Sequence, residues 1–386
     1  MDQTVEAPVT TLLDTIIEQP YESPLARILA TSRWDVRLAD TKFDTLHRLR
    51  DACVAMRKNS RVYTLSSTDL QFNVVDEKVL VDGIGDWAEF TNWSFSQMAA
   101  RLKSPAAFLR TLPPTLTVDI LRHKLTTVTN HDKVKLLTIE RGDQRPLLQA
   151  TTGPDYGRIW YADTVEAAIG VLHEDDNWRC WKSSMSDRDI DITLLHHDDP
   201  CALQEWIDKK NGYHSFLKSG SRFIKGIRIR NSEVGAYTYT VECFFLDSAC
   251  NNGVILGKRV HKSFAVRHTV NAPNRFASEV VPQLNAFAHA QFPIQSIHNK
   301  LALIPLPFSG DIDDMAKNDK SFTRPELKAA KYHALSEGQH NWGNYRDLFD
   351  GLTSVARDYD WADAQADLQR RAGDLLALVK TDSIAA

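Results

Sequence analysis

The alternating segment at residues 236–246 constrains the fold more than any other part of the sequence. On an extended chain, one side of this segment carries Tyr237, Tyr239, Val241 and Cys243. Strand-like segments precede it at residues 222–230 and follow it at residues 254–270, after the turn Asn251-Asn252-Gly253. Parallel pairing needs longer connections than these turns, so the three segments are predicted to form an antiparallel meander.

The rest of the chain mixes strand-like and helix-like segments, and only helices are expected near its end. Thr323 and Glu326 have the spacing of a capping box, and helical patterns follow at residues 325–336, 345–357 and 362–379. We therefore predict an α+β fold, in which an antiparallel sheet meander has flanking helices and a helical C-terminal region. The predicted units are an N-terminal arm over 1–40, an α+β core domain over 41–310 and the helical C-terminal region over 311–386.

Positive charge is concentrated in and around the meander. The whole chain has 46 Lys and Arg against 50 Asp and Glu, for a net charge of -4. Residues 216–270 alone hold nine Lys and Arg and three Asp and Glu, a net charge of +6, which leaves -10 for the remainder. This segregation favours an anionic partner at the meander, such as a nucleic acid.

Three arginines of the first strand have the same parity and are therefore expected on one face, where they could follow a phosphate backbone: Arg222, Arg228 and Arg230. The full set of predicted phosphate contacts is Arg222, Lys225, Arg228, Arg230, Lys258, Arg259 and Lys262. Tyr237 or Tyr239 would stack on bases, as aromatic rings do in proteins that bind single strands. The alternative is an ordinary solvated sheet face. A second basic and aromatic cluster, at residues 178–182, is interpreted as a packing element.

Three aspartates also alternate along the sequence, at Asp187, Asp189 and Asp191. A strand would place these carboxylates on one side, where they could bind a divalent cation such as Mg²⁺. The alternative is the wet face of an edge strand, whose charge discourages pairing with other chains. The sequence has no HExxH, Walker A, GxSxG or GxGxxG motif, so we expect no cofactor and no catalytic residue outside the metal-site alternative.

The sequence also bears on cellular location. Its five cysteines form no CxxC pair, which is typical of reduced thiols in a cytosol. The N-terminal segment has no basic leader, and no apolar run is long enough to cross a bilayer. These features predict a cytoplasmic protein without membrane contact.

The turn Asn231-Ser-Glu-Val-Gly235 and the later Cys250-Asn-Asn-Gly253 are spaced as in a known family. Together with residues 152–159, 186–190 and 342–357, they resemble a phage and plasmid-like family catalogued as domain of unknown function 932. The similarity spans about residues 100–360. It implies a mobile-element context, but it supplies no set of catalytic residues.

The leading hypothesis combines the basic meander with this resemblance: a cytoplasmic mobile-element protein that binds single-stranded DNA and anneals strands in recombination as a homo-oligomer, without catalysis. One alternative is a metal-dependent nuclease that uses Asp187, Asp189 and Asp191. Another is a protein-binding accessory or anti-defence factor, whose helical C-terminal region binds the partner.

Overall fold

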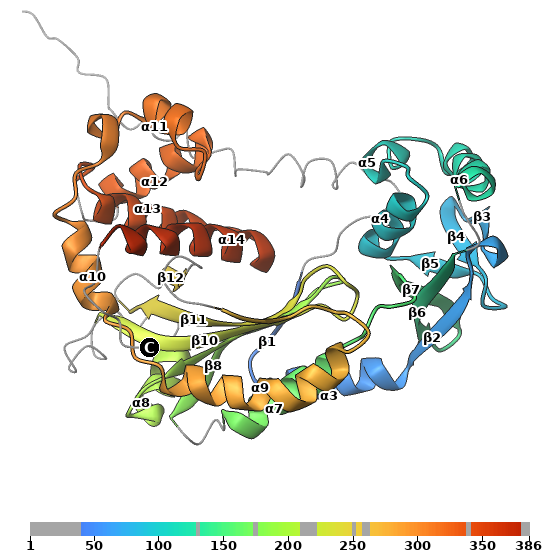
Figure 1. Ribbon diagram of the computed structural model, residues 1–386, viewed down its shortest axis with the longest axis horizontal. Helices are drawn as coiled ribbons and strands as arrows, with labels where there is room; N and C mark the ends of the chain where they lie inside the picture. Colours follow the sequence, from blue (N-terminus) through green and yellow to red (C-terminus); the bar gives the residue numbers. More distant parts are fainter. Residues whose placement is uncertain are drawn as a thin grey trace, which may run out of the picture.

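The computed structural model describes residues 40–128, 132–172, 177–208, 222–248, 252–256, 263–336 and 341–379. Almost all of the predicted N-terminal arm lies outside these residues, as do Lys258, Arg259 and Lys262. The described chain contains two sheets, flanking helices and a helical C-terminal region (Figure 1). The predicted α+β fold is confirmed.

The large sheet contains the predicted meander. Its strands are β1 (Thr41–Phe43), β8 (Trp178–Met185), β9 (Ile190–His196), β10 (Phe223–Asn231), β11 (Tyr239–Asp247), β12 (Asn252–Ile255) and β13 (Phe264–Val266). The order is β1-β8-β9-β10-β11-β12, and every pair is antiparallel. The third strand expected at 254–270 is instead two short strands, β12 and β13, which both pair with β11.

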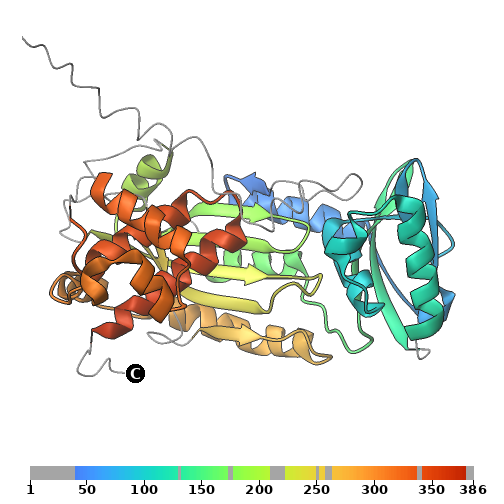
Figure 2. The same cartoon turned by 90° about the horizontal axis from the view of Figure 1, so that it is seen from above.

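Helices cover both faces of the large sheet (Figures 1 and 2). One face, called here the α9 side, packs against α3 (Leu46–Lys58), α7 (Tyr161–Val171) and α9 (Ala272–His289). Ile192, Ile227 and Val241 belong to the hydrophobic core on this side. The core is apolar because alternate residues of three adjacent strands all point toward these helices.

The C-terminal helices cover part of the other face, called here the α14 side. They are α10 (Ile294–Leu301), α11 (Ile312–Asn318), α12 (Arg324–Ser336), α13 (Tyr345–Arg357) and α14 (Ala362–Gly373). The predicted capping box forms at the start of α12, where Glu326 accepts from the backbone N–H of Thr323 at 2.7 Å. Both α13 and α14 pack on β12, and Ala366 joins a small apolar cluster with α8 (Pro200–Asp208).

A second, smaller sheet has its own core. It consists of β2 (Ser60–Ser66), β3 (Gln71–Val75), β4 (Lys78–Asp82), β5 (Ala88–Phe90), β6 (Lys133–Arg141) and β7 (Gln144–Thr152). Its pairs are antiparallel except β5 with β7. The accompanying helices are α4 (Asn92–Arg101), α5 (Ala106–Leu109) and α6 (Pro114–Val128). The region 41–310, predicted as one core domain, therefore holds two sheets with separate apolar clusters.

The turn between β10 and β11 joins the two sheets. The carbonyl oxygen of Val234 accepts from Trp93 Nε1 at 3.2 Å and from Gln97 Nε2 at 2.6 Å, both on α4. The Tyr156 hydroxyl donates to the Ser232 carbonyl at 2.8 Å. Gly235 has φ +82°, and a Cβ there would lie 3.3 Å from the Tyr156 ring. Glycine is thus required both by the backbone and by the close approach of the ring.

Within the described ranges, every helix is too short or too polar to cross a lipid bilayer.

Candidate functional site

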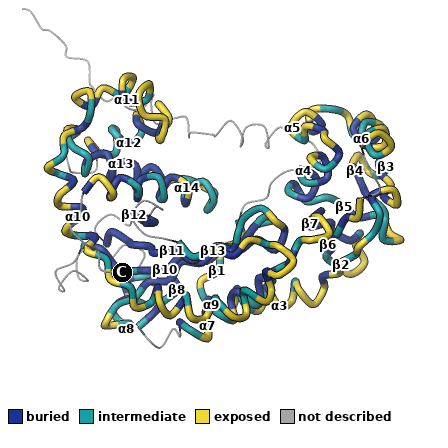
Figure 3. Tube along the Cα trace, in the orientation of Figure 1, coloured by how far each residue is buried: buried dark blue, intermediate teal, exposed yellow. Residues whose placement is uncertain are grey.

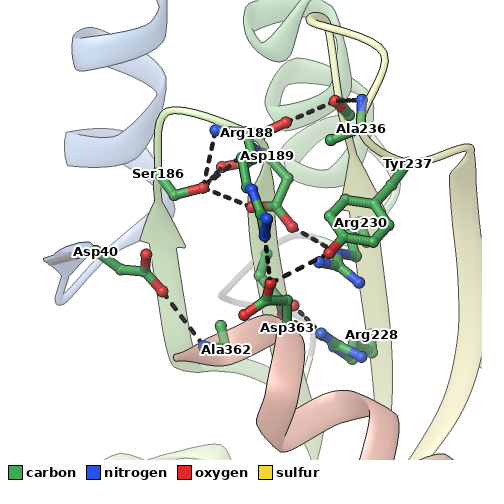
Figure 4. Close-up of polar contacts among 12 residues, drawn as sticks. Asp40, Ser186, Arg188, Asp189, Arg228, Arg230, Ala236, Tyr237, Ala362 and Asp363 are labelled. Carbon is green, nitrogen blue, oxygen red and sulfur yellow. Dashed lines mark hydrogen bonds and ion pairs between the residues drawn. The ribbon is translucent and has the colours of Figure 1, made fainter. Parts of the chain in front are cut away.

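Arg228 and Arg230 lie on the same face of β10, as their parity predicts, but that face is not solvated. Their exposed fractions are 3% and 6%, and Figure 3 shows β10 and β11 buried along most of their length. Arg228 Nε donates to Asp191 Oδ1 at 2.9 Å. Arg230 Nε donates to Asp189 Oδ2 at 2.5 Å (Figure 4). The expectation of a phosphate-binding face here is corrected, because Asp191 of β9 and Asp189 just before it are the anions that these arginines contact.

These buried ion pairs extend to α14, and together they are called here the ionic layer: Asp189, Asp191, Arg228, Arg230, Glu242 and Arg370. Arg370 of α14 forms two parallel hydrogen bonds with Glu242 of β11, at 2.8 and 2.9 Å, and Arg228 Nη1 lies 3.7 Å from the same carboxylate. Burial alone raises the pKa of Glu242. The hydrogen bonds and charges of the two arginines outweigh it and hold that pKa below its usual value.

Arg188, in the turn between β8 and β9, connects three parts of the chain. It donates to Asp363 of α14 at 2.8 Å, and the Tyr237 hydroxyl donates to the same carboxylate at 3.2 Å (Figure 4). Its guanidinium also lies 5.1 Å from the centre of the Trp93 ring on α4. Tyr237 in turn stacks on Arg230, 3.3 Å from its ring centre. Tyr237 is therefore already engaged on its hydroxyl and on its ring.

Among the described residues, the remaining predicted contacts do not form one surface with these arginines: Arg222, Lys225 and Tyr239. Tyr239 is fully buried on the α9 side, and Lys225 Nζ donates to the Ala288 carbonyl at the end of α9. Arg222 forms ion pairs with Asp247 and Asp350. The expected basic face is corrected for these residues as well, because they are divided between the two sides of the sheet or neutralised by carboxylates.

The three aspartates of the metal-site alternative have separate partners. Asp187 Oδ2 accepts from the Trp93 N–H at 3.1 Å, Asp189 pairs with Arg230, and Asp191 pairs with Arg228. Asp187 and Asp189 lie in the turn before β9, and Asp191 lies in β9 itself. Because β9 lies between β8 and β10, the prediction of an edge strand is wrong. Among the residues that the structure describes, no group of three His, Cys, Asp or Glu is arranged to hold a metal ion.

A pocket of about 970 Å³ adjoins the ionic layer on the α14 side. β1, β8 and β9 form one wall, α8 a second, and residues 357–369 of α13, α14 and the segment between them a third. Asp191 and Arg228 of the ionic layer form part of its lining. The volume is within the range of small-molecule sites.

A β-bulge determines which side chains enter the pocket. Cys180 pairs with Leu194 while Lys182 pairs with Thr193, so Trp181 is an additional residue in β8. Trp181 packs against Phe244, and Lys182 is opposite Thr193, so both consecutive side chains are on the α14 side. Alternation along the sequence predicts that consecutive residues point to opposite faces, so it could not show that Trp181 and Lys182 share one. A bulge interrupts this two-residue period. The prediction of a packing element at 178–182 fits Trp178, which is buried, but it missed the place of Trp181 in the pocket wall.

Lys182 has an unusual electrostatic environment. Desolvation by the surrounding protein, followed by the positive charges of Lys42 and Arg357, lowers its pKa to about 8. Its Nζ lies 4.2 Å from the centre of the Trp181 ring. The other charged side chains that line the pocket are Asp40, Asp44, Arg48, Asp191, Asp208, Arg228 and Asp360.

Several of these pocket carboxylates have partners of their own. Asp44 pairs with Arg48 at 2.9 Å, Asp191 pairs with Arg228, and Asp208 accepts from the Gln204 amide at 2.8 Å. Within the described chain, neither Lys42 nor Lys182 has a carboxylate at ion-pair distance. The pocket thus combines a tryptophan with two lysines that have no acidic partner among the described residues. Such a set of groups can bind an anion attached to a planar ring.

Arg57, Arg158 and Glu233 form a separate charged group under the β10–β11 turn, away from the pocket. The described site therefore has two parts: a buried ionic layer that fixes α14 on the sheet, and an adjoining pocket with Trp181, Lys182 and Lys42 in its lining. Comparisons with known protein families, curated proteins and solved structures gave no match.

Proposed function

We propose that this chain binds single-stranded nucleic acid at the pocket beside α14. The observation that carries the proposal is the β8 bulge, which places Trp181 and Lys182 side by side in the pocket wall. Lysines beside aromatic rings are the groups that proteins use to hold phosphates and stack unpaired bases. A single strand is favoured over a duplex because paired bases are already stacked on one another and cannot lie on Trp181.

The proposal relocates the interface that the charge pattern suggested. Arg228 and Arg230 support the pocket from the buried ionic layer, while Lys42 and Lys182 make the phosphate contacts. Annealing by a homo-oligomer, a cytoplasmic location and the mobile-element context belong to the same proposal. Sizing chromatography with and without an oligonucleotide tests the oligomer, and a strand-annealing assay tests the activity.

The first test is a salt titration of oligonucleotide binding. We expect a labelled single strand to bind more tightly than its duplex, with an affinity that falls as salt rises. Replacing Lys42 and Lys182 together with alanine should weaken binding and lower the logarithmic salt slope by about 1.4, since each lost phosphate contact on a single strand contributes roughly 0.7. Fluorescence anisotropy at several salt concentrations measures both quantities.

Lys328→Ala is the matched control, because Lys328 is exposed on α12 and is not in the pocket lining. It should leave the affinity and the slope unchanged. An equal loss in this control, or an unchanged slope in the double variant, would remove the pocket from the interface. Absence of any binding at low salt would overturn the function itself and favour the protein-partner alternative.

The pKa of Lys182 predicts how binding depends on pH. The ammonium form attracts phosphate, and a bound anion raises its pKa, so affinity is full below pH 8 and falls as the pH rises above it. For one linked proton, the decrease approaches tenfold per pH unit. Lys182→Arg should abolish the decrease, because arginine stays charged throughout this range. Parallel pH profiles for the two proteins would contradict a contact between Lys182 and the anion.

A further inference from the structure

Three of the five Lys and Arg that line the pocket lie near one another. Lys42 of β1 pairs with Ser184 of β8, so Lys42 and Lys182 are diagonal neighbours on adjacent antiparallel strands. Such neighbours lie roughly 7–8 Å apart, close enough for both ammonium groups to reach one small anion. Arg357, the last residue of α13, lines the same pocket and lies close enough to act on the charge of Lys182.

Together, Lys42, Lys182 and Arg357 carry more positive charge than one internal phosphate of a strand requires. A phosphodiester carries a single negative charge, whereas a phosphomonoester carries about 1.5 to 2 negative charges at pH 7. A dianion is therefore the better match for three neighbouring cations, two of which have no acidic partner among the described residues. Contacts to successive phosphodiesters would instead be met by cations spread along a groove.

The size and lining of the pocket also indicate a compact ligand. Its 970 Å³ fits a molecule of one or two nucleotide units. The Trp181 ring packs against Phe244 and lies 4.2 Å from Lys182 Nζ, so a base takes the place of that ammonium group on the ring when Lys182 turns to the phosphate. Arg357 is held in position by Asn252 and Asp358, each at 3.2 Å. A group fixed in this way needs little reordering to bind an anion.

We propose that the pocket recognises a nucleoside phosphomonoester, with the phosphate between Lys42, Lys182 and Arg357 and the base against Trp181. This inference rests on the proposed function where the phosphomonoester is the phosphorylated end of a strand. A free mononucleotide presents the same chemistry, and the experiment separates the two sources.

The experiment compares oligo(dT) strands that differ only at one end. Strands labelled at the 3′ end carry a 5′-phosphate or a 5′-hydroxyl, and strands labelled at the 5′ end carry a 3′-phosphate or a 3′-hydroxyl. We expect one terminal phosphate to increase affinity at least tenfold in fluorescence anisotropy. The increase should disappear in Lys42→Ala/Lys182→Ala and persist in Lys328→Ala. Isothermal titration with dTMP, thymidine and inorganic phosphate completes the comparison.

Each outcome decides between the sources or rejects the inference. A preference for the phosphorylated strand without dTMP binding identifies the strand end as ligand. Binding of dTMP without strand binding identifies a free nucleotide and overturns the proposed function while supporting this inference. Salt-sensitive strand binding with no effect of a terminal phosphate and no dTMP binding overturns the inference and leaves the proposed function standing. Inorganic phosphate binding as tightly as dTMP would overturn the contact with a base.

Discussion

Replacing Arg228 with methionine should destabilise the protein by about 3–5 kcal/mol, the usual cost of removing one partner from a buried ion pair. Arg228 is 3% exposed and pairs with Asp191, so its removal leaves that carboxylate buried without a counter-charge. Glu242 retains its two hydrogen bonds to Arg370. Chemical denaturation at pH 7, followed by far-UV circular dichroism, measures the loss.

A second substitution separates a structural role for Arg228 from contact with a ligand. In Arg228→Met/Asp191→Asn the uncompensated charge is gone, so this variant should be more stable than Arg228→Met alone by about 1–3 kcal/mol. Once folded, it should bind a single strand with nearly wild-type affinity and salt slope. Wild-type stability of Arg228→Met together with a complete loss of strand binding would return Arg228 to the nucleic-acid interface.

Local pattern was sufficient to predict the meander but not the small sheet. β10 and β11 are joined by a short turn, and alternation along residues 236–246 determines which side of β11 is apolar. In the small sheet, β2 at Ser60–Ser66 pairs with β6 at Lys133–Arg141 across a long intervening segment. Nothing in either segment alone specifies that partner, because the pairing depends on packing under α4 and α6.

For the site, the parity of Arg228 and Arg230 correctly predicted that they share one face of β10. The prediction that this face is open to a nucleic acid was wrong, because other parts of the chain cover it. Arg370 reaches Glu242 from a helix 128 residues further along the chain, and Asp191 is 37 residues before Arg228. Such distant partners leave no periodic signal in the sequence. The bulge at Trp181 was also hidden, since one additional residue in a strand has no fixed composition.

Glu233, in the β10–β11 turn, provides the second large expected effect. It is 1% exposed, and its Oε2 accepts from the Tyr161 N–H at the start of α7 at 3.0 Å. Burial raises the pKa of Glu233 to about 7, against the opposing effects of that hydrogen bond and the charges of Arg158 and Arg57. Ionised Glu233 therefore lowers the free energy of unfolding, whereas the neutral acid does not lower it.

The expected result is that Glu233→Gln is more stable than the wild type at pH 8. A rise in pKa from 4.5 to about 7 corresponds to roughly 3 kcal/mol. The folded state holds this proton more tightly than the unfolded state does, so the wild type loses stability relative to the variant as the pH rises from 4.5 to 7. The difference should be close to zero below pH 4.5 and constant above pH 7. Denaturation of both proteins across this range measures it.

Glu326→Gln is the control of opposite sign. Burial raises the pKa of Glu326, but hydrogen bonds from Arg371 and from the Thr323 N–H outweigh burial, so its pKa lies below the usual value. Its ionised form stabilises the fold above the unfolded-state pKa, and this contribution is lost as the pH falls. Glu326→Gln should therefore be less stable than the wild type at pH 8, with the difference shrinking in acid. If Glu233→Gln followed the same course, Glu233 would be an ionised partner of Arg158 and Arg57, and the turn would be held by charge rather than by a neutral hydrogen bond.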